Sequence, residues 1–466
     1  MTTVKEDADA SMTESKDPAF WEKLSHSAKA VLKTLKQLED NQNLDLFQPG
    51  PEFFELKKIV ATYRGGCYSA VTRRLDRIVS KGGVDIITSS DLMSIIRDLW
   101  NRNISRLTET ELKVLEGVLK NPEMSMNDLS TKVGLSYSRT RRAIEQLRAT
   151  GILKRQGRPD AALLGLDRIL IISENPSGIL GSPYFTRFLY SDGATPRVFV
   201  KGLIPSRKRQ EFLQTIRTLR SVSDSTSVWA LSSGEPRFSF CYYDKEKKKF
   251  EFDPLHFRLL LRAGGQDLTI GSFSIGQIRF PNRFNASEIK IIESLLDDFD
   301  MTAQQLVERT GISESTAFRR RGKVLSEHII RPRPKISIPS LSDRVLGIFS
   351  ADSAGNIINA WTQLPLSYVS QLTNMDDPRK KKILFATALP AGSARDLIDV
   401  LSSEMSRIDD YEVYEISAGT RQNLPVASLY DTKAKQWSFN SAFFDVRNYG
   451  ICRREASRYD IPLDLA

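Results

Sequence analysis

Arginines in two short segments are the side chains of this chain whose types and spacing are best suited to chemistry. The first segment carries Tyr137, Ser138, Arg139, Arg141 and Arg142. A guanidinium group can bond the O6 and N7 atoms of guanine together, and clustered positive charge attracts backbone phosphates. The segment therefore indicates contact with a nucleic acid. The simpler interpretation is a basic helix face that only solvent covers.

The second segment lies in a repeat of the first. The stretch that begins at Leu107 aligns without a gap with the stretch that begins at Phe284. Identical residues pair Glu111 with Glu288, Met124 with Met301, Gly134 with Gly311, Ser138 with Ser315 and Arg142 with Arg319. The matching surface of the second segment consists of Glu314, Ser315, Thr316, Phe318, Arg319 and Arg320. Weaker echoes, such as YYDKEKKKFEFD and LYDTKAKQWSFN, indicate that a unit of roughly 150 residues is duplicated.

Local signals place both clusters on the third helix of a helix-turn-helix. Thr108 and Glu111 form a capping box before an apolar stripe, and Gly134 supplies the left-handed turn before the third helix. We expect that helix to bury Thr140, Ile144 and Leu147 and to direct the arginine cluster outward. The β-forming stretch after Gly151 is expected to complete a wing.

The second repeat departs from the first at one packing position. Arg321 stands where the first repeat has Ile144. A buried and unpaired arginine is costly. Either its head group reaches solvent along an apolar surface, or the helix rotates and buries Phe318 instead.

The remainder of each repeat alternates strand and helix patterns. In the second repeat we expect strand 344–350, helix 356–364, strand 367–373, strand 382–389, helix 393–405 and strand 411–416. This βαββαβ order is that of a ferredoxin-like sandwich. In the first repeat, residues 177–182 leave little room for the first helix, and a hairpin of 237–243 with 249–253 extends the domain.

The stretches LSTKVGLSYSRTRRAIEQLRATGIL and LVERTGISESTAFRRRGKVLSEHII, each followed by a βαββαβ pattern, resemble the leucine-responsive regulator (Lrp/AsnC) family. Members of that family have one unit per chain and pair through the α/β domain, which often binds an amino acid at the interface. The resemblance implies an intramolecular pseudo-dimer, further homo-oligomerisation and a small-molecule effector.

The first hundred residues favour helices. Trp21, Leu24, Ala28, Val31, Leu35 and Leu38 form an apolar stripe. Such a stripe is typical of a globular domain or of a dimerising helix. The stretch TRRLDRIVSKGG resembles the MarR-type winged helix and places Arg73 and Arg74 on its third helix. This region is predicted to be a divergent third module; the alternative is a helical linker. Residues 88–103 are expected to form a connecting helix.

The fold class that these patterns predict is α+β, with tandem winged helix-turn-helix modules that are each followed by a ferredoxin-like domain. The expected parts are a disordered tail (1–17), the helical region (18–104), the first module (105–160), the first ferredoxin-like domain (161–280), the second module (281–335) and the second ferredoxin-like domain (336–466).

Composition and charge limit the classes of function that the chain can have. The net charge of +10 and the pI near 9.3 favour an anionic partner. Three scattered cysteines and three scattered histidines make no disulfide framework or zinc ligand set, so we expect reduced, packed thiols and no metal or other cofactor. Neither a membrane span nor a signal peptide is evident, which predicts a cytoplasmic, nucleoid-associated protein.

The leading hypothesis is a transcriptional regulator that binds double-stranded DNA and has no enzymatic activity. A second hypothesis makes the winged helices protein-binding modules of a transcription or replication complex, with Tyr137 and Phe318 as exposed anchors. A third follows from the family resemblance, because some proteins built in this way decarboxylate tetrapyrroles. That chemistry favours clustered histidines, and His256 and His328 are the only ones in the two repeats.

Overall fold

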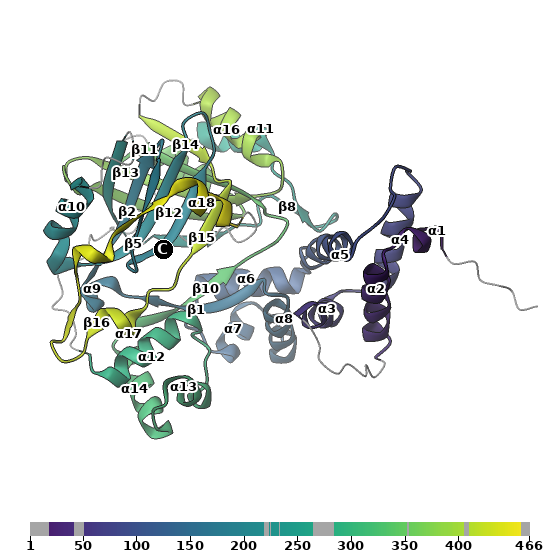
Figure 1. The fold of residues 1–466 in the computed structure, drawn as a ribbon, viewed down its shortest axis with the longest axis horizontal. Coiled ribbons are helices and arrows are strands. Elements are labelled where there is room, and N and C mark those ends of the chain that lie inside the picture. The colour runs from purple at the N-terminus through teal and green to yellow at the C-terminus, as the bar shows by residue number, and fades with distance from the viewer. Residues whose placement is uncertain are drawn as a thin grey trace, which may run out of the picture. The chain divides into compact units, whose positions relative to one another are not determined.

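The computed structural model describes residues 18–41, 51–218, 223, 225–232, 234–263, 284–351, 354–404 and 410–457. The chain divides into two compact units, Met1–Ser105 and Arg106–Ala466 (Figure 1). The predicted disordered tail, residues 1–17, lies outside the described residues. In the described part of the chain the fold is α+β, as the sequence predicts.

The first unit is built from helices around one apolar core. The helices are α1 (Ala19–Lys23), α2 (His26–Glu39), α3 (Pro51–Thr62), α4 (Cys67–Val79) and α5 (Ser89–Ile104). The apolar stripe of α2 is buried inside this unit, where Ala28, Leu32 and Leu35 are fully covered. The stripe therefore belongs to a globular domain and does not form a free dimerising face. The expected connecting helix is α5, which Thr88 begins with a capping box to Asp91.

Both helix-turn-helix patterns of the second unit are present. The first consists of α6 (Glu109–Lys120), α7 (Met126–Lys132) and α8 (Tyr137–Thr150), and the second of α12 (Ala286–Asp297), α13 (Ala303–Thr310) and α14 (Glu314–Ser326). Thr108 caps α6 and Asn285 caps α12, each in a capping box. Gly134 and Gly311 provide the turns at φ of +67° and +68°, a region that costs other residues energy.

The strands that follow these helices pair with each other. β1 (Leu153–Pro159) and β10 (Ile330–Ile336) form an antiparallel ribbon, from Leu153 opposite Ile336 to Pro159 opposite Ile330. The β-forming stretch expected after Gly151 is thus present as β1, and its partner strand comes from the other module. After β1 the chain turns at once into the short helix α9 (Ala161–Leu164), so β1 has no local partner strand and pairs with the equivalent strand of the other module.

Four further contacts hold the two modules together. Asp300, which follows α12, accepts hydrogen bonds from Arg148 Nη2 at 2.7 Å and from Arg155 Nη1 at 3.0 Å. The Arg155 guanidinium also lies 5.3 Å from the centroid of the Phe299 ring. At Gly157 the ribbon crosses α12 so closely that a Cβ atom there would stand 2.3 Å from the carbonyl oxygen of Leu295.

The α/β parts of the two repeats share one curled antiparallel sheet. The first contributes β2 (Leu166–Glu174), β4 (Phe185–Ser191), β5 (Arg197–Pro205), α10 (Arg209–Thr218) and β6 (Ser225–Leu231). The second contributes β11 (Asp343–Ser350), α15 (Ala354–Thr362), β12 (Leu366–Asn374), β13 (Lys381–Leu389), α16 (Ser393–Glu404) and β14 (Tyr411–Glu415). The second set has the predicted βαββαβ order.

Within the described residues, the strand order of this ten-stranded sheet is β14-β11-β13-β12-β6-β2-β5-β4-β15, with β7 (Glu235–Phe238) on β12. Each half thus repeats the same arrangement, and the halves join where β12 meets β6. Only Ile416 and Ser417 separate β14 from β15 (Ala418–Arg421), which pairs with β4. One stretch of chain therefore connects the two ends of the sheet.

The strand pairing decides two expectations about the first half of the sheet. In place of the first helix stands β3 (Gly178–Gly181), which pairs with β18 (Asp445–Asn448), as the short 177–182 stretch indicated. The hairpin predicted from 237–243 and 249–253 is wrong in its extent. Only β8 (Tyr243–Asp244) and β9 (Lys249–Phe250) pair, because β7 fills the edge of β12 that β6 leaves open.

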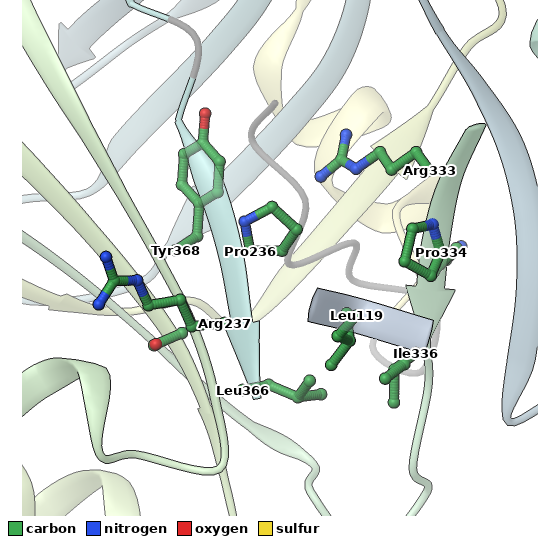
Figure 2. A pocket seen from close by; sticks show the side chains of 10 residues that line it. Leu119, Pro236, Arg237, Arg333, Pro334, Ile336, Leu366 and Tyr368 are labelled. Atoms are coloured by element: carbon green, nitrogen blue, oxygen red, sulfur yellow. The ribbon is translucent and has the colours of Figure 1, made fainter. Parts of the chain in front are cut away.

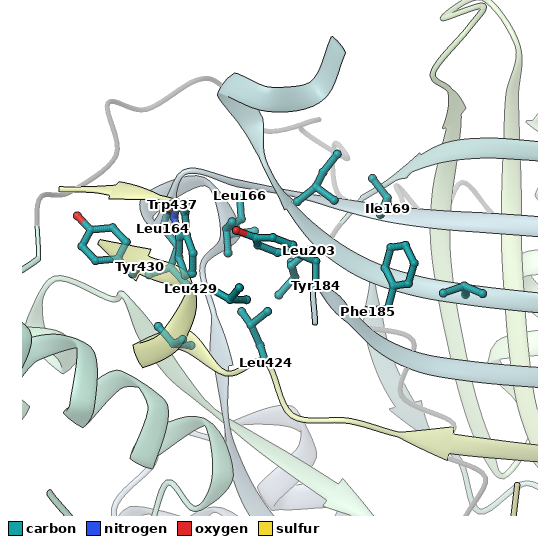
Figure 3. Close-up of a cluster of buried hydrophobic side chains, with 14 of the residues drawn as sticks. Leu164, Leu166, Ile169, Tyr184, Phe185, Leu203, Leu424, Leu429, Tyr430 and Trp437 are labelled. Atoms are coloured by element: carbon teal, nitrogen blue, oxygen red, sulfur yellow. Dashed lines mark hydrogen bonds between the residues drawn. The ribbon is translucent and has the colours of Figure 1, made fainter. Parts of the chain in front are cut away.

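A short hairpin after each half contacts the start of a helix-turn-helix. Tyr243 Oη donates to the carbonyl of Leu107 at 2.8 Å, and the N–H of Phe284 donates to Tyr430 Oη at 3.2 Å. The second hairpin consists of β16 (Tyr430–Asp431) and β17 (Gln436–Trp437) and follows α17 (Val426–Leu429). Figure 3 shows its Tyr430 and Trp437 in the apolar cluster with Leu164.

The remaining described elements cover the sheet. They are the 3-10 turns η1 (Ser206–Lys208) and η4 (Ser441–Phe443) and the helices α11 (Pro254–Arg262) and α18 (Tyr449–Glu455). Helix α11 packs against α15 and α16 of the other half. Arg453 of α18 donates to Asp192 after β4. Each half is therefore covered partly by segments that come from the other.

Replacing Gly157 by alanine tests the close crossing of the ribbon and α12. The new Cβ must displace the backbone of Leu295, so we expect the free energy of unfolding of the second unit to fall by about 1–3 kcal/mol. Urea denaturation followed by circular dichroism measures the change. Gly193→Ala is the matched control, because nothing lies within 4 Å of a Cβ at that position. Equal stability of the two variants would contradict the crossing.

Candidate nucleic-acid interface

Helix α8 presents the predicted cluster to solvent. Its inner side is buried at the three expected positions, where Thr140, Ile144 and Leu147 are 0%, 5% and 0% exposed. Its outer side carries Tyr137, which is 47% exposed, and the exposed Ser138, Arg139, Arg141 and Arg142. The sequence thus predicted the orientation of this helix correctly.

The arginines on α8 differ in whether their guanidinium groups already pair with a carboxylate. Arg141 Nε donates to Glu145 Oε1 at 2.7 Å, and this exposed contact raises the pKa of the guanidinium. In the described part of the chain, Arg139 and Arg142 have no ion pair with any carboxylate. Ser136 caps the helix by accepting from the N–H of Arg139 at 3.4 Å. Two free guanidinium groups therefore stand near a helix N-terminus, where the backbone also favours anions.

Helix α14 presents a different surface. Phe318 is 73% exposed, and Ser315 and Arg319 are exposed, while Thr316 is half-buried and accepts from Ser313 Oγ at 2.9 Å. Arg321 is half-buried beside the buried Ala317 and Val324. The helix has therefore not rotated to bury Phe318.

Arg320 does not face outward as predicted. Its Nη1 donates to Glu288 Oε1 at 2.7 Å, and Lys323 Nζ donates to the same oxygen at 2.9 Å. The Glu288 side chain, part of the α12 capping box, is only 3% exposed. A buried carboxylate without a partner is costly. Arg320 and Lys323 therefore compensate an internal charge, so the expected outward role of Arg320 is corrected.

The charge balance around Glu288 sets its pKa. Burial alone would raise the pKa of Glu288, but the N–H of Asn285 and the cations Lys323 and Arg320 outweigh it and hold the pKa below its ordinary value of 4.5. The carboxylate is therefore ionised at neutral pH, and the ion pairs stabilise the second module there.

The first unit carries the two remaining candidate arginines. Arg73 and Arg74 are exposed on α4, whose inner side buries Val71 and Leu75. Arg73 Nε donates to the carbonyl of Ser69 at 3.1 Å. The described residues of this unit contain no β-hairpin, and their strand pairing is a single parallel bridge between Leu24 and Ile87.

The surroundings of each thiol determine its reactivity, and the described side chains also decide whether a metal ion could bind. Cys67 is buried, and desolvation raises the pKa of its thiol to about 12, so it packs as an inert apolar group. Cys241 is exposed, so the expectation that all three thiols are packed is wrong there. The described residues hold no group of three or more His, Cys, Asp or Glu side chains that could bind a metal ion.

The comparisons identify one domain. Residues 107–154 match the family model described as winged helix-turn-helix DNA-binding, and this range covers α6, α7, α8 and the start of β1. The chain therefore contains a winged helix-turn-helix DNA-binding domain. None of the curated proteins matches the chain. No helix in the described ranges combines the length and apolarity needed to cross a membrane.

The chain is similar to two solved structures. One is the crystal structure of the siroheme decarboxylase NirDL, at 12% sequence identity and a TM-score of 0.39. The other is the same protein in co-complex with an iron-uroporphyrin III analogue, at 12% identity and a TM-score of 0.40. Each comparison covers 67% of this chain and 93% of the other.

Sequence reasoning did not find the ribbon or the pairing of Asp300 with Arg148 and Arg155. A usable signal existed for the ribbon. The strand-length runs LKRQGRP and IRPRPKI each follow a third helix, and neither is followed by a hairpin turn and a second strand. Two such unpartnered strands in one chain favour pairing with each other.

Replacing Glu288 by glutamine tests the internal ion pairs of α14. Because the folded-state pKa is lowered, the stabilising effect is present above pH 4.5 and is lost as the pH falls through the folded value. We expect Glu288→Gln to melt at a lower temperature than the wild type at pH 7, and the gap to shrink below pH 4.5. Thermal melts across this pH range measure it. Glu314→Gln, at an exposed site on the same module, is the control, and a gap independent of pH would contradict the assignment.

Proposed function

We propose that this chain is a DNA-binding transcriptional regulator whose α8 contacts the major groove of a duplex. The observation that carries the proposal is the pair of exposed guanidinium groups of Arg139 and Arg142 on the outer side of that helix, which have no ion pair within the described ranges. The domain match at residues 107–154 supports it. Tyr137 and Ser138 lie at the same helix end and add polar and aromatic contacts to bases or phosphates.

We further propose that the two repeats form an intramolecular pseudo-dimer of Lrp/AsnC-like units. The gapless alignment of the two modules, the repeated strand order in the two halves of the sheet and the β1–β10 ribbon support this. With the duplication we also propose the boundaries that the sequence predicts for the modules and the ferredoxin-like domains. In homodimeric regulators, two identical modules meet two half-sites; here both modules lie on one chain.

The two modules contribute unequally in this proposal. Helix α8 supplies the base-reading arginines. On α14, Arg320 and Lys323 face Glu288, so Arg319, Ser315, Thr316 and Phe318 remain for contact. A phenyl ring reads no hydrogen-bonding pattern, but it can contact a thymine methyl group. The second module therefore positions the duplex, and the first determines the sequence.

One observation favours a second candidate function, docking of a protein partner. Phe318 and Tyr137 are both large, exposed side chains, at 73% and 47%, on helices directed outward. Aromatic side chains of this kind anchor protein interfaces. A partner that is retained after nuclease treatment, from a chain with no affinity for free duplex, would favour docking over DNA binding.

Removing the two unpaired arginines tests the main proposal. We expect Arg139→Ala with Arg142→Ala to weaken duplex binding at least tenfold, because each bidentate contact contributes about 1–3 kcal/mol. Fluorescence anisotropy at two salt concentrations measures the affinity, and circular dichroism confirms the fold. Arg379→Ala is the control, because this exposed arginine lies in the β12–β13 turn. Unchanged affinity in the double variant would rule out reading by α8.

Replacing Arg73 and Arg74 tests whether the first unit is a third DNA-binding module. If both guanidinium groups bind phosphates, the double alanine variant should lower the slope of log affinity against log salt by about two. The sequence preference should stay the same, because phosphate contacts carry no base information. Anisotropy titrations across a salt series measure the slope. A slope identical to the wild type would assign the first unit to another role.

A further inference from the structure

A recess opens where the first module meets the shared sheet. Its walls come from α6, β7, β10 and β12, and the space around it, open solvent included, is about 470 Å³. Leu119, Pro236 and Leu366 form an apolar side. Figure 2 shows Arg333 entering from β10, with its guanidinium directed toward Pro236 and Tyr368, and Arg237 on the other side.

The charges that face the recess are all positive. Arg237, Arg333 and Lys335 line it, and none of the 10 described residues in its wall is acidic. Arg333 is 7% exposed, so its guanidinium lies in a region of low dielectric constant. Arg237 is exposed at the rim and, among the described residues, has no ion pair. Cationic groups on two sides of an apolar surface are complementary to an amphiphilic anion.

Buried polar atoms beneath the recess add to this polarity. Ser367 is 2% exposed, and within the described structure its Oγ has no hydrogen-bond partner. Burial raises the pKa of Tyr368, and the nearby guanidinium groups of Arg333, Arg158 and Arg168 act against that rise. The recess therefore lies in a positive field from several arginines, and an unsatisfied hydroxyl lines it.

We propose that this recess binds a small organic anion, with a carboxylate or phosphate head group on an apolar body, as an effector of the first module. The arginines bond the head group, for which a planar guanidinium is well matched. The apolar body lies on Leu119, Pro236 and Leu366. A zwitterionic amino acid is disfavoured, because its ammonium group would find no carboxylate among the described residues of the wall.

The location of the recess links the ligand to DNA, a step that rests on the proposed function. Leu119 belongs to α6, the first helix of the DNA-binding domain, and Arg333 belongs to the ribbon that joins the two modules. A ligand that contacts α6, β10 and β12 together fixes the first module against the sheet. Any resulting change in DNA affinity is reciprocal, so bound duplex changes ligand affinity by the same factor.

Titration of the full chain with four probes tests the binding site. Benzoate and phenyl phosphate carry the two head groups on one ring, benzamide lacks the charge, and acetate lacks the ring. We expect saturable heat of binding with benzoate or phenyl phosphate in isothermal titration calorimetry, and at least tenfold weaker binding of benzamide and acetate. Preference between the two anions assigns the head group. Absence of saturable binding by both anions overturns the proposal.

Variants place the binding in the recess. Arg237→Met and Arg333→Met should each weaken binding of the better anion about tenfold, and Arg379→Met, at an exposed site in the β12–β13 turn, should leave it unchanged. If Arg333→Met does not fold, the anion affinity of Arg237→Met, a variant at the rim, still decides whether the anion binds in the recess. Full affinity in Arg237→Met overturns the assignment. Calorimetry without DNA tests the site, and anisotropy without ligand tests DNA binding, so failure of one is distinguishable from failure of the other.

Discussion

The antiparallel pairing of β1 with β10 is the constraint on which the second unit depends. Each strand leaves the third helix of a helix-turn-helix, so the ribbon joins α8 and α14 through a short, hydrogen-bonded path. Gly157 lets α12 cross the ribbon in direct backbone contact, and Asp300 binds an arginine from α8 and another from β1. The two modules cannot move independently unless these contacts break. The two modules therefore keep a fixed orientation relative to each other.

A few differences between aligned positions give the two modules different surfaces. Arg320 and Lys323 stand where the first module has Ala143 and Gln146, and both reach the buried Glu288. Their charge stabilises the inside of the second module and is not available on its surface. Phe318, where the first module has Arg141, gives α14 an exposed apolar side chain. The two modules are thus similar scaffolds with different surfaces, and the exposed Arg139 and Arg142 lie on the first.

Local features were predictable from the sequence, and long-range pairings were not. The capping boxes at Thr108 and Asn285 and the turns at Gly134 and Gly311 depend on neighbours within a few residues, so the helices and the outward face of α8 could be predicted. The β7–β12 pair and the recess bring together distant segments that leave no local signature, and the ribbon left only two strand-length runs without a local partner strand. The contact between Arg320 and Glu288 could not be predicted either, because Glu288 already had a local role in the capping box.

The account requires one chain to hold two DNA-contacting modules at a constant separation. Selection of bound fragments from a genomic library, followed by hydroxyl-radical footprinting of the selected duplexes, tests this directly. The account predicts a shared motif, with two protected segments at the same spacing in every fragment, because the ribbon fixes the modules. Fragments without a shared motif, or two protected segments whose spacing varies, would contradict it.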